Sequence, residues 1–106
     1  MAQFDVHRNL GRSRATFPYL VIVQSAQFDR FRRRLVVPLV LRSLLGEVVV
    51  PRLNPSFEIE GTSVVLHPLE IASLEVSALG PHIGTLREQG QLICDALDEA
   101  TTRAWG

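Results

Sequence analysis

The sequence has no lysine, so all eleven of its basic residues are arginine. It has a single cysteine, Cys94, which excludes an internal disulfide and is typical of a protein kept in a reducing compartment. No apolar run approaches the roughly 20 residues that a membrane-spanning helix needs. The first residues, MAQFDVHRN, lack the basic and apolar regions of a signal peptide. We therefore expect one cytoplasmic domain over residues 1–106, with no membrane partner.

Catalytic and metal-binding motifs are also missing. His7, His67 and His82 lie in three separate segments, and none stands at metal-ligand spacing from another ligand. Cys94 has no nearby basic residue to lower its pKa and make it a nucleophile. The glycines form no phosphate-binding loop, and no serine lies in a nucleophile-elbow motif. The residues therefore predict no enzyme, no metal and no cofactor.

Charge is balanced overall but uneven along the chain. Residues 1–52 hold nine arginines against three acids, whereas residues 53–106 hold two arginines against eight acids. This polarity is compatible with a molecule whose basic and acidic faces meet different partners.

The densest basic cluster is DRFRRRL at 29–35, next to Phe28. Interleaved arginine and phenylalanine are typical of single-strand nucleic-acid sites, but the same pattern also suits a solubilising loop before an apolar strand. Because the whole chain is neutral, we expect the loop, and no direct sequence-specific contact with nucleic acid.

The alternation of apolar and polar residues predicts a run of antiparallel strands between about residues 3 and 80. Pro38 lacks an N–H donor, so we expect it at a strand end or on an edge. Glu60-Gly61-Thr62 is typical of a tight hairpin turn, with Glu60 on a solvated face. The expected strands and hairpin lie at 3–8, 18–25, 33–40, 48–68 and 72–80.

After Gly80-Pro81 the apolar residues recur three and four apart, which predicts one amphipathic helix over about 82–102. The fold class is therefore α+β, mainly β, with one C-terminal helix. Trp105, the only tryptophan, lies off the apolar stripe of this helix. Three roles are open for Trp105: an anchor in the core, a tail residue without a specific contact, or a residue at the tip that contacts a target.

Four stretches, in this order and spacing, resemble the CcdB family: MAQFDVHRN, PYLVIVQS, RRLVVPL and VLHPLEIASLEVSALG. The stretches LNPSFEIEG and ICDALD fit the same pattern. The resemblance implies a small antiparallel β-barrel-like domain, the toxin barrel that CcdB and MazF proteins share. It also implies a homodimeric toxin of a type II toxin–antitoxin module, which is not an enzyme. Such a toxin traps DNA gyrase on cleaved DNA and is removed by a CcdA-like antitoxin.

In this family the gyrase A subunit is contacted by the C-terminal tip. The resemblance therefore implies a target-binding tip of Trp105 and Gly106, preceded by Thr102 and Arg103, with a second region around Ser25 to Phe28. The chain departs from the family in two places. Ile22 stands where an acid is usual, and an ungapped match puts the tip on residues 102–104, about three residues before the tryptophan.

Two other functions stay open at this stage. One is a MazF-type mRNA endoribonuclease, in which arginine and threonine or serine act without an obvious motif. The other is a non-toxic CcdB-like dimer that has kept only its partner binding, which the altered ending favours.

Overall fold

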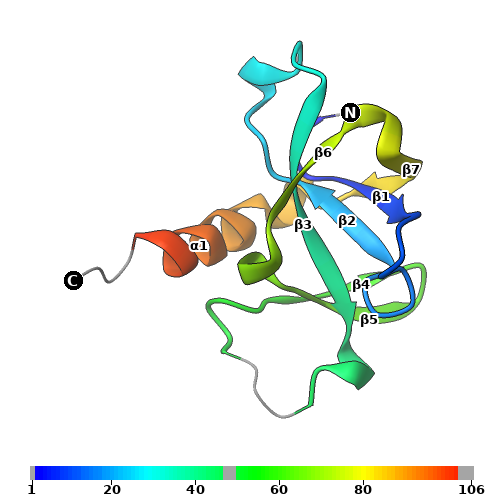
Figure 1. The fold of residues 1–106 in the computed structure, drawn as a ribbon. Coiled ribbons are helices and arrows are strands. Elements are labelled where there is room, and N and C mark those ends of the chain that lie inside the picture. The colour runs from blue at the N-terminus through cyan, green and yellow to red at the C-terminus, as the bar shows by residue number, and fades with distance from the viewer. Residues whose placement is uncertain (1, 47–49, 103–106) are drawn as a thin grey trace.

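The computed structural model describes residues 2–46 and 50–102. Figure 1 shows an antiparallel sheet with one helix packed against it. The elements are β1 (Asp5–Asn9), β2 (Tyr19–Ile22), β3 (Arg33–Leu41), β4 (Ser56–Ile59), β5 (Thr62–Leu66), β6 (Ala72–Glu75), β7 (Leu79–Thr85) and α1 (Gly90–Thr101).

The strands form one curved sheet in the order β4-β5-β3-β2-β1-β7. The long strand β3 pairs with β2 along one edge. Along its other edge it pairs first with β6 and then with β5. All of these pairings are antiparallel. The fold is a half-barrel sheet with one C-terminal helix. The predicted fold class is confirmed.

The expectation that Pro38 lies at a strand end or edge is wrong, because Pro38 lies inside β3 and pairs with Leu20 of β2. Its carbonyl accepts a hydrogen bond from the N–H of His67, so the backbone of residue 38 faces away from β2. On that side β3 changes its partner from β6, which ends its pairing at Val36, to β5, which begins at Leu39. The missing N–H of Pro38 therefore falls where neither ladder needs a donor.

One face of the sheet, here called the inner face, carries the main core. Alternate residues of β1, β2, β3 and the β4–β5 hairpin point into it and are buried. From α1, Ile93 and Ala96 reach the same core and are fully buried, and Leu97 packs at its margin. This is the arrangement that the helical stripe predicts.

The predicted start of the helix, at about residue 82, is wrong by eight residues. Residues Leu79–Thr85 instead form β7, the edge strand next to β1, and α1 begins at Gly90. Pro81 is tolerated there because an edge strand has one side without a partner. Ile83 and Leu86 still pack against the inner core. Their spacing of three residues therefore matches the apolar pattern of a helix, although both residues precede α1.

The expected strand at 72–80 is likewise broken. Residues Ala72–Glu75 form β6, residues Val76–Ala78 form a 3₁₀ turn, and Leu79 already belongs to β7. By contrast, the hairpin between β4 and β5 is confirmed. Its turn residues Glu60 and Gly61 have φ angles of 51° and 76°, as a two-residue type I′ turn requires.

Two glycines of β7 allow a matched test of this geometry. A Cβ atom on Gly80 would lie 2.6 Å from the backbone oxygen of Arg8, whereas one on Gly84 would meet no atom within 4 Å. Because a backbone atom cannot move aside cheaply, Gly80→Ala should destabilise the fold by about 1–3 kcal/mol. Gly84→Ala should change stability by no more than about 0.5 kcal/mol. Urea denaturation of both variants measures the difference, and equal stabilities would contradict the close packing of β7 on β1.

Candidate functional site

The C-terminal end of α1 extends beyond the sheet (Figure 1). The buried residues of the helix are Gly90, Ile93 and Ala96, all in its first two turns. Thr102, an exposed residue, ends the helix, and its backbone N–H donates to the carbonyl of Asp98 at 2.8 Å. Of the expected tip residues, Thr102 is therefore at the exposed end of the helix. Arg103, Trp105 and Gly106 lie outside the described residues.

The second expected contact region follows β2. Ser25 precedes a 3₁₀ turn over Ala26–Phe28, and Phe28 is 45% exposed. This turn, drawn in cyan in Figure 1, lies well away from the end of α1. Within one chain the structure therefore does not bring Ser25 and Phe28 together with Thr102.

The outer face of the sheet, opposite α1, holds a groove of about 360 Å³. Its floor is apolar and comes from β2, β3 and β6, including Leu20, Val36 and Leu74. Glu70 and Asn9 are polar groups on its walls. The lining is completed by Gly11, Ser13, Phe17, Pro38, Ala72 and Ala78. Large apolar side chains next to these positions are also exposed, namely Leu10, Leu69 and Ile71.

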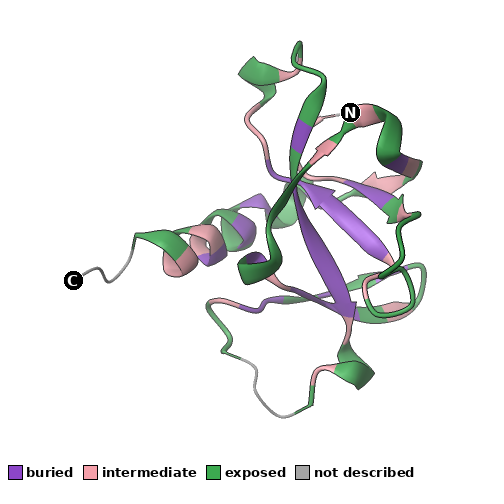
Figure 2. Ribbon diagram, in the orientation of Figure 1, coloured by how far each residue is buried: buried purple, intermediate pink, exposed green. Residues whose placement is uncertain are grey.

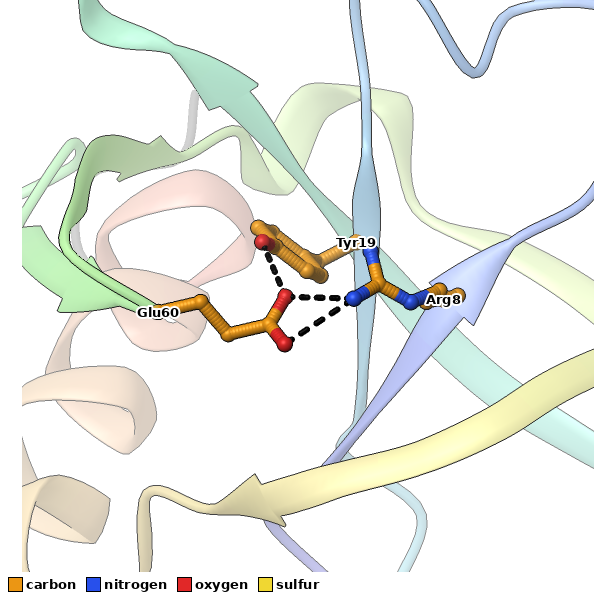
Figure 3. Close-up of polar contacts among 3 residues, drawn as sticks. All are labelled: Arg8, Tyr19 and Glu60. Carbon is orange, nitrogen blue, oxygen red and sulfur yellow. Dashed lines mark hydrogen bonds and ion pairs between the residues drawn. The ribbon is translucent and has the colours of Figure 1, made fainter.

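A polar cluster ties the β4–β5 turn to β1 and β2 (Figure 3). One oxygen of the Glu60 carboxylate accepts hydrogen bonds from Arg8 and from the Tyr19 hydroxyl, each at 2.7 Å, and the other accepts from Arg8 at 2.9 Å. Glu60 is thus a bonded group and not the free solvated side chain that its position in the sequence predicts. Burial raises the pKa of Tyr19, and the hydrogen bond to the Glu60 carboxylate raises it further.

The structure also joins two histidines that the sequence keeps apart. His7 of β1 pairs with His82 of β7, and their rings meet edge to face with centroids 5.4 Å apart. His82 Nε2 lies 3.5 Å from the Asp5 carboxylate, which also accepts the backbone N–H of Ala2. The β1–β7 pairing creates this contact. The sequence could have indicated this contact only through a strand at residues 79–85, and the helical spacing of the apolar residues conceals that strand.

Two arginines of the 29–35 cluster serve the structure. Arg34 is buried, and its guanidinium donates to the backbone carbonyls of Asp29, Phe31 and Arg33. Arg33 donates to the hydroxyl and carbonyl of Ser73, and one of its nitrogens lies 4.0 Å from Glu75. Sequence reasoning treated the four arginines as equivalent because nothing in their order separates the buried one from the others.

Residues 2–46 and 50–102 contain neither a metal-binding cluster nor a membrane-spanning helix. No group of three or more His, Cys, Asp or Glu side chains in these ranges is placed to hold a metal ion. No helix among them is long and apolar enough to cross a membrane.

Comparison with known proteins gives one family and a consistent fold. The family model described as CcdB protein matches residues 3–102. A solved structure of an endoribonuclease in complex with its cognate antitoxin, from a mycobacterial species, has a TM-score of 0.76 and 17% identity, covering 100% of this chain and 99% of that chain. A second mycobacterial endoribonuclease gives a TM-score of 0.71 and 16% identity, covering 100% of this chain and 95% of the other. Comparison with curated protein sequences gives no significant match.

The Tyr19 pKa provides a test of the polar cluster, because Tyr19 is the only tyrosine. Its ionisation should have a midpoint above the ordinary value near 10. In Glu60→Gln the midpoint should fall, because the carboxylate that favours the protonated hydroxyl is gone. The Tyr19 pKa is higher in the folded protein than in the unfolded chain, so the protonated hydroxyl stabilises the fold fully at pH values below the unfolded-state pKa. This contribution is lost as the pH rises through the folded-state pKa. Tyrosinate difference absorbance in both proteins measures the shift, and identical midpoints would contradict the bond.

Proposed function

The chain belongs to the CcdB family, and we propose that it is a toxin that binds the DNA gyrase A subunit through its C-terminal tip. Binding there would trap the gyrase–DNA cleavage complex without any covalent chemistry by the toxin itself. The observation that carries the proposal is the family match over residues 3–102, nearly the whole chain. Gyrase acts on chromosomal and plasmid DNA, so the proposed place of action is the cytoplasm.

The geometry of α1 supports recognition through the tip. The buried residues of the helix lie in its first two turns, and Thr102 is exposed at the far end. We assign Trp105 as the anchor of the target contact and Gly106 as the residue that lets the target backbone approach. Tryptophan brings a large apolar area at a small cost in side-chain entropy, which suits a binding anchor.

The proposed partners besides gyrase are a second copy of the chain and a CcdA-like antitoxin. A second copy offers a cover for the outer-face groove, whose apolar floor and exposed Leu69 and Ile71 lie opposite the helix. Apolar surface of this kind is typical of a two-fold self-contact.

A second candidate function is that of an mRNA endoribonuclease. The observation that favours it is the fold, since the two solved structures described above are endoribonucleases. The groups that it would draw on for acid–base chemistry are His82 with Asp5, and Glu60 with Arg8. We favour gyrase binding because the family match is to CcdB.

Induced expression separates these functions. A gyrase poison should linearise or relax plasmid DNA while RNA stays intact, and an endoribonuclease should fragment RNA first. If neither DNA nor RNA changes, the chain is a non-toxic partner-binding dimer.

Trp105→Ala should weaken binding to a gyrase A fragment by roughly 30- to 1000-fold, because truncating a desolvated tryptophan at an interface costs about 2–4 kcal/mol. The thermal midpoint should hardly change. Leu92→Ala is a matched control, since Leu92 is an exposed apolar residue of α1 far from the tip. Calorimetric titration measures both. Full binding by the Trp105 variant would place the contact elsewhere, and a large fall in stability would make Trp105 a structural anchor.

The homodimer is tested separately. The wild-type chain should sediment as a dimer at micromolar concentration. Leu69→Asp with Ile71→Asp should sediment as a folded monomer, because two carboxylates cannot be buried in an apolar contact. A wild-type monomer would remove the dimer from the proposal. A dimer that survives the double substitution would place the contact on another face.

A further inference from the structure

The turn over residues 50–54, just before β4, is tied to the sheet by a buried side chain. Its backbone is closed by the N–H groups of Leu53 and Asn54, which donate to the carbonyl of Val50 at 2.9 and 2.7 Å. The buried Asn54 side chain accepts the N–H of Val50 and donates to the carbonyl of Leu66 in β5. The turn therefore has a fixed place relative to the core hairpin.

Two prolines limit the freedom of the same turn. Pro51 and Pro55 stand on either side of residues 52–54, and the ring of each proline fixes its own φ angle. Because such a turn has little conformational entropy left to lose, a contact made from it can orient a neighbouring element at low cost.

The side chain of Arg52 extends from this turn to α1. Its Nε lies 3.9 Å from Oε2 of Glu99, a residue in the last turn of the helix. The Glu99 side chain is 29% exposed and the Arg52 side chain 64% exposed. Among the ion pairs of residues 2–46 and 50–102, this is the one that involves α1. A cation beside the last turn also faces the negative end of the helix macrodipole, which favours the same contact.

The last turn of α1 is less firmly packed than the first two, which hold all of the buried residues of the helix. Leu97 packs at the margin of the core. The hydrogen bonds of Thr101 and Thr102 run back to the carbonyls of Leu97 and Asp98, within the helix itself. A contact from outside the helix therefore affects the direction of this turn more than it affects the stability of the whole fold.

We propose that Arg52 is a positioning residue for the C-terminal tip, which holds the last turn of α1 through Glu99 and so sets the direction in which the chain continues after Thr102. The inference rests on the proposed function, in which Trp105 and Gly106 contact the target. Arg52 acts on the tip through the helix and not by touching the target. Fixing the helix end before binding lowers the entropic cost of binding. Since exposed ion pairs are weak, the effect on affinity is roughly three- to fivefold.

Amide hydrogen exchange tests this positioning without any target. In Arg52→Gln the amide of Thr102 should exchange roughly three- to fivefold faster than in the wild type, because the last turn opens more often. The amide of Ile93, in the packed part of α1, should exchange at an unchanged rate. At 1 M salt, where the Debye length is about 3 Å, the wild type should approach the rate of the variant.

Charge rescue separates an ion pair from a general packing role of the side chain. Arg52→Lys keeps the charge and should retain most of the protection of the Thr102 amide. Arg52→Glu should lose more protection than Arg52→Gln, because two carboxylates then face each other. Adding Glu99→Arg to Arg52→Glu should restore the protection. A double variant no better protected than Arg52→Glu alone would overturn the proposal.

Glu75→Gln is the matched control. It removes an ion pair of similar length, at 4.0 Å from Arg33, which joins β3 to β6 and involves no residue of α1. This variant should leave the exchange of Thr102 unchanged, and thermal melts establish that every variant is folded. Unchanged exchange in Arg52→Gln, or an equal rise in Glu75→Gln, would overturn the proposal.

Binding to a gyrase A fragment allows the two proposals to fail separately. Arg52→Gln should bind roughly three- to fivefold more weakly than the wild type, and Glu75→Gln should bind as the wild type does. Full binding by Arg52→Gln, despite faster exchange at Thr102, would overturn the positioning role. A wild-type chain that binds no gyrase would remove the proposed function, and the exchange rates would still decide whether Arg52 holds the last turn.

Discussion

The fold depends on β3, whose nine residues pair with three other strands. Along one edge it holds β2, and along the other it holds β6 and then β5, so its backbone connects both ends of the half-barrel. Pro38 marks the exchange of partners, because its missing donor would otherwise break a ladder. Since β3 is central, its side chains are buried on the inner face by the hairpin and α1. On the outer face they form the floor of a groove that no element of the described chain covers.

The uneven charge along the sequence acquires a structural explanation. All three Arg–Glu ion pairs of the described residues join an arginine of residues 1–52 to a glutamate of residues 53–106: Arg8 with Glu60, Arg33 with Glu75, and Arg52 with Glu99. The two halves of the chain are interleaved in the sheet, so some of their opposite charges meet in these three pairs. Each exposed pair contributes at most about 1 kcal/mol.

The sequence predicts those parts of the fold in which local pattern and tertiary position agree. The hairpin around Glu60-Gly61 could be predicted because turn chemistry and alternation coincide there. Residues 79–85 could not, because Ile83 and Leu86 face the same core as the helix and so mimic its period. The contact of His7 with His82 depends on the pairing of two strands distant in the sequence, about which local spacing carries no information. The role of Arg34 depends on how residues 29–33 fold around its guanidinium, which the order of the arginines does not reveal. For the candidate site, the exposed helix end was predictable, whereas the rigidity of the loop around Phe28 was not.

The buried contacts that hold α1 to the sheet lie near the start of the helix, away from the proposed recognition tip. Gly90 lies against the ring of Phe4, where a Cβ atom would come within 2.7 Å, and Ile93 and Ala96 complete the buried contacts. Phe4 itself has a φ angle of 71°, and this strained backbone is held by hydrogen bonds to Ile22 and from Leu86. The helix is therefore fixed at its beginning by close packing, and Thr102 at its end makes no core contact. Because three residues turn a helix by about 300° and lengthen it by about 4.5 Å, an ending that is three residues longer would present nearly the same face further out. The proposed target contact at the tip is thus separate from the packing that holds the helix.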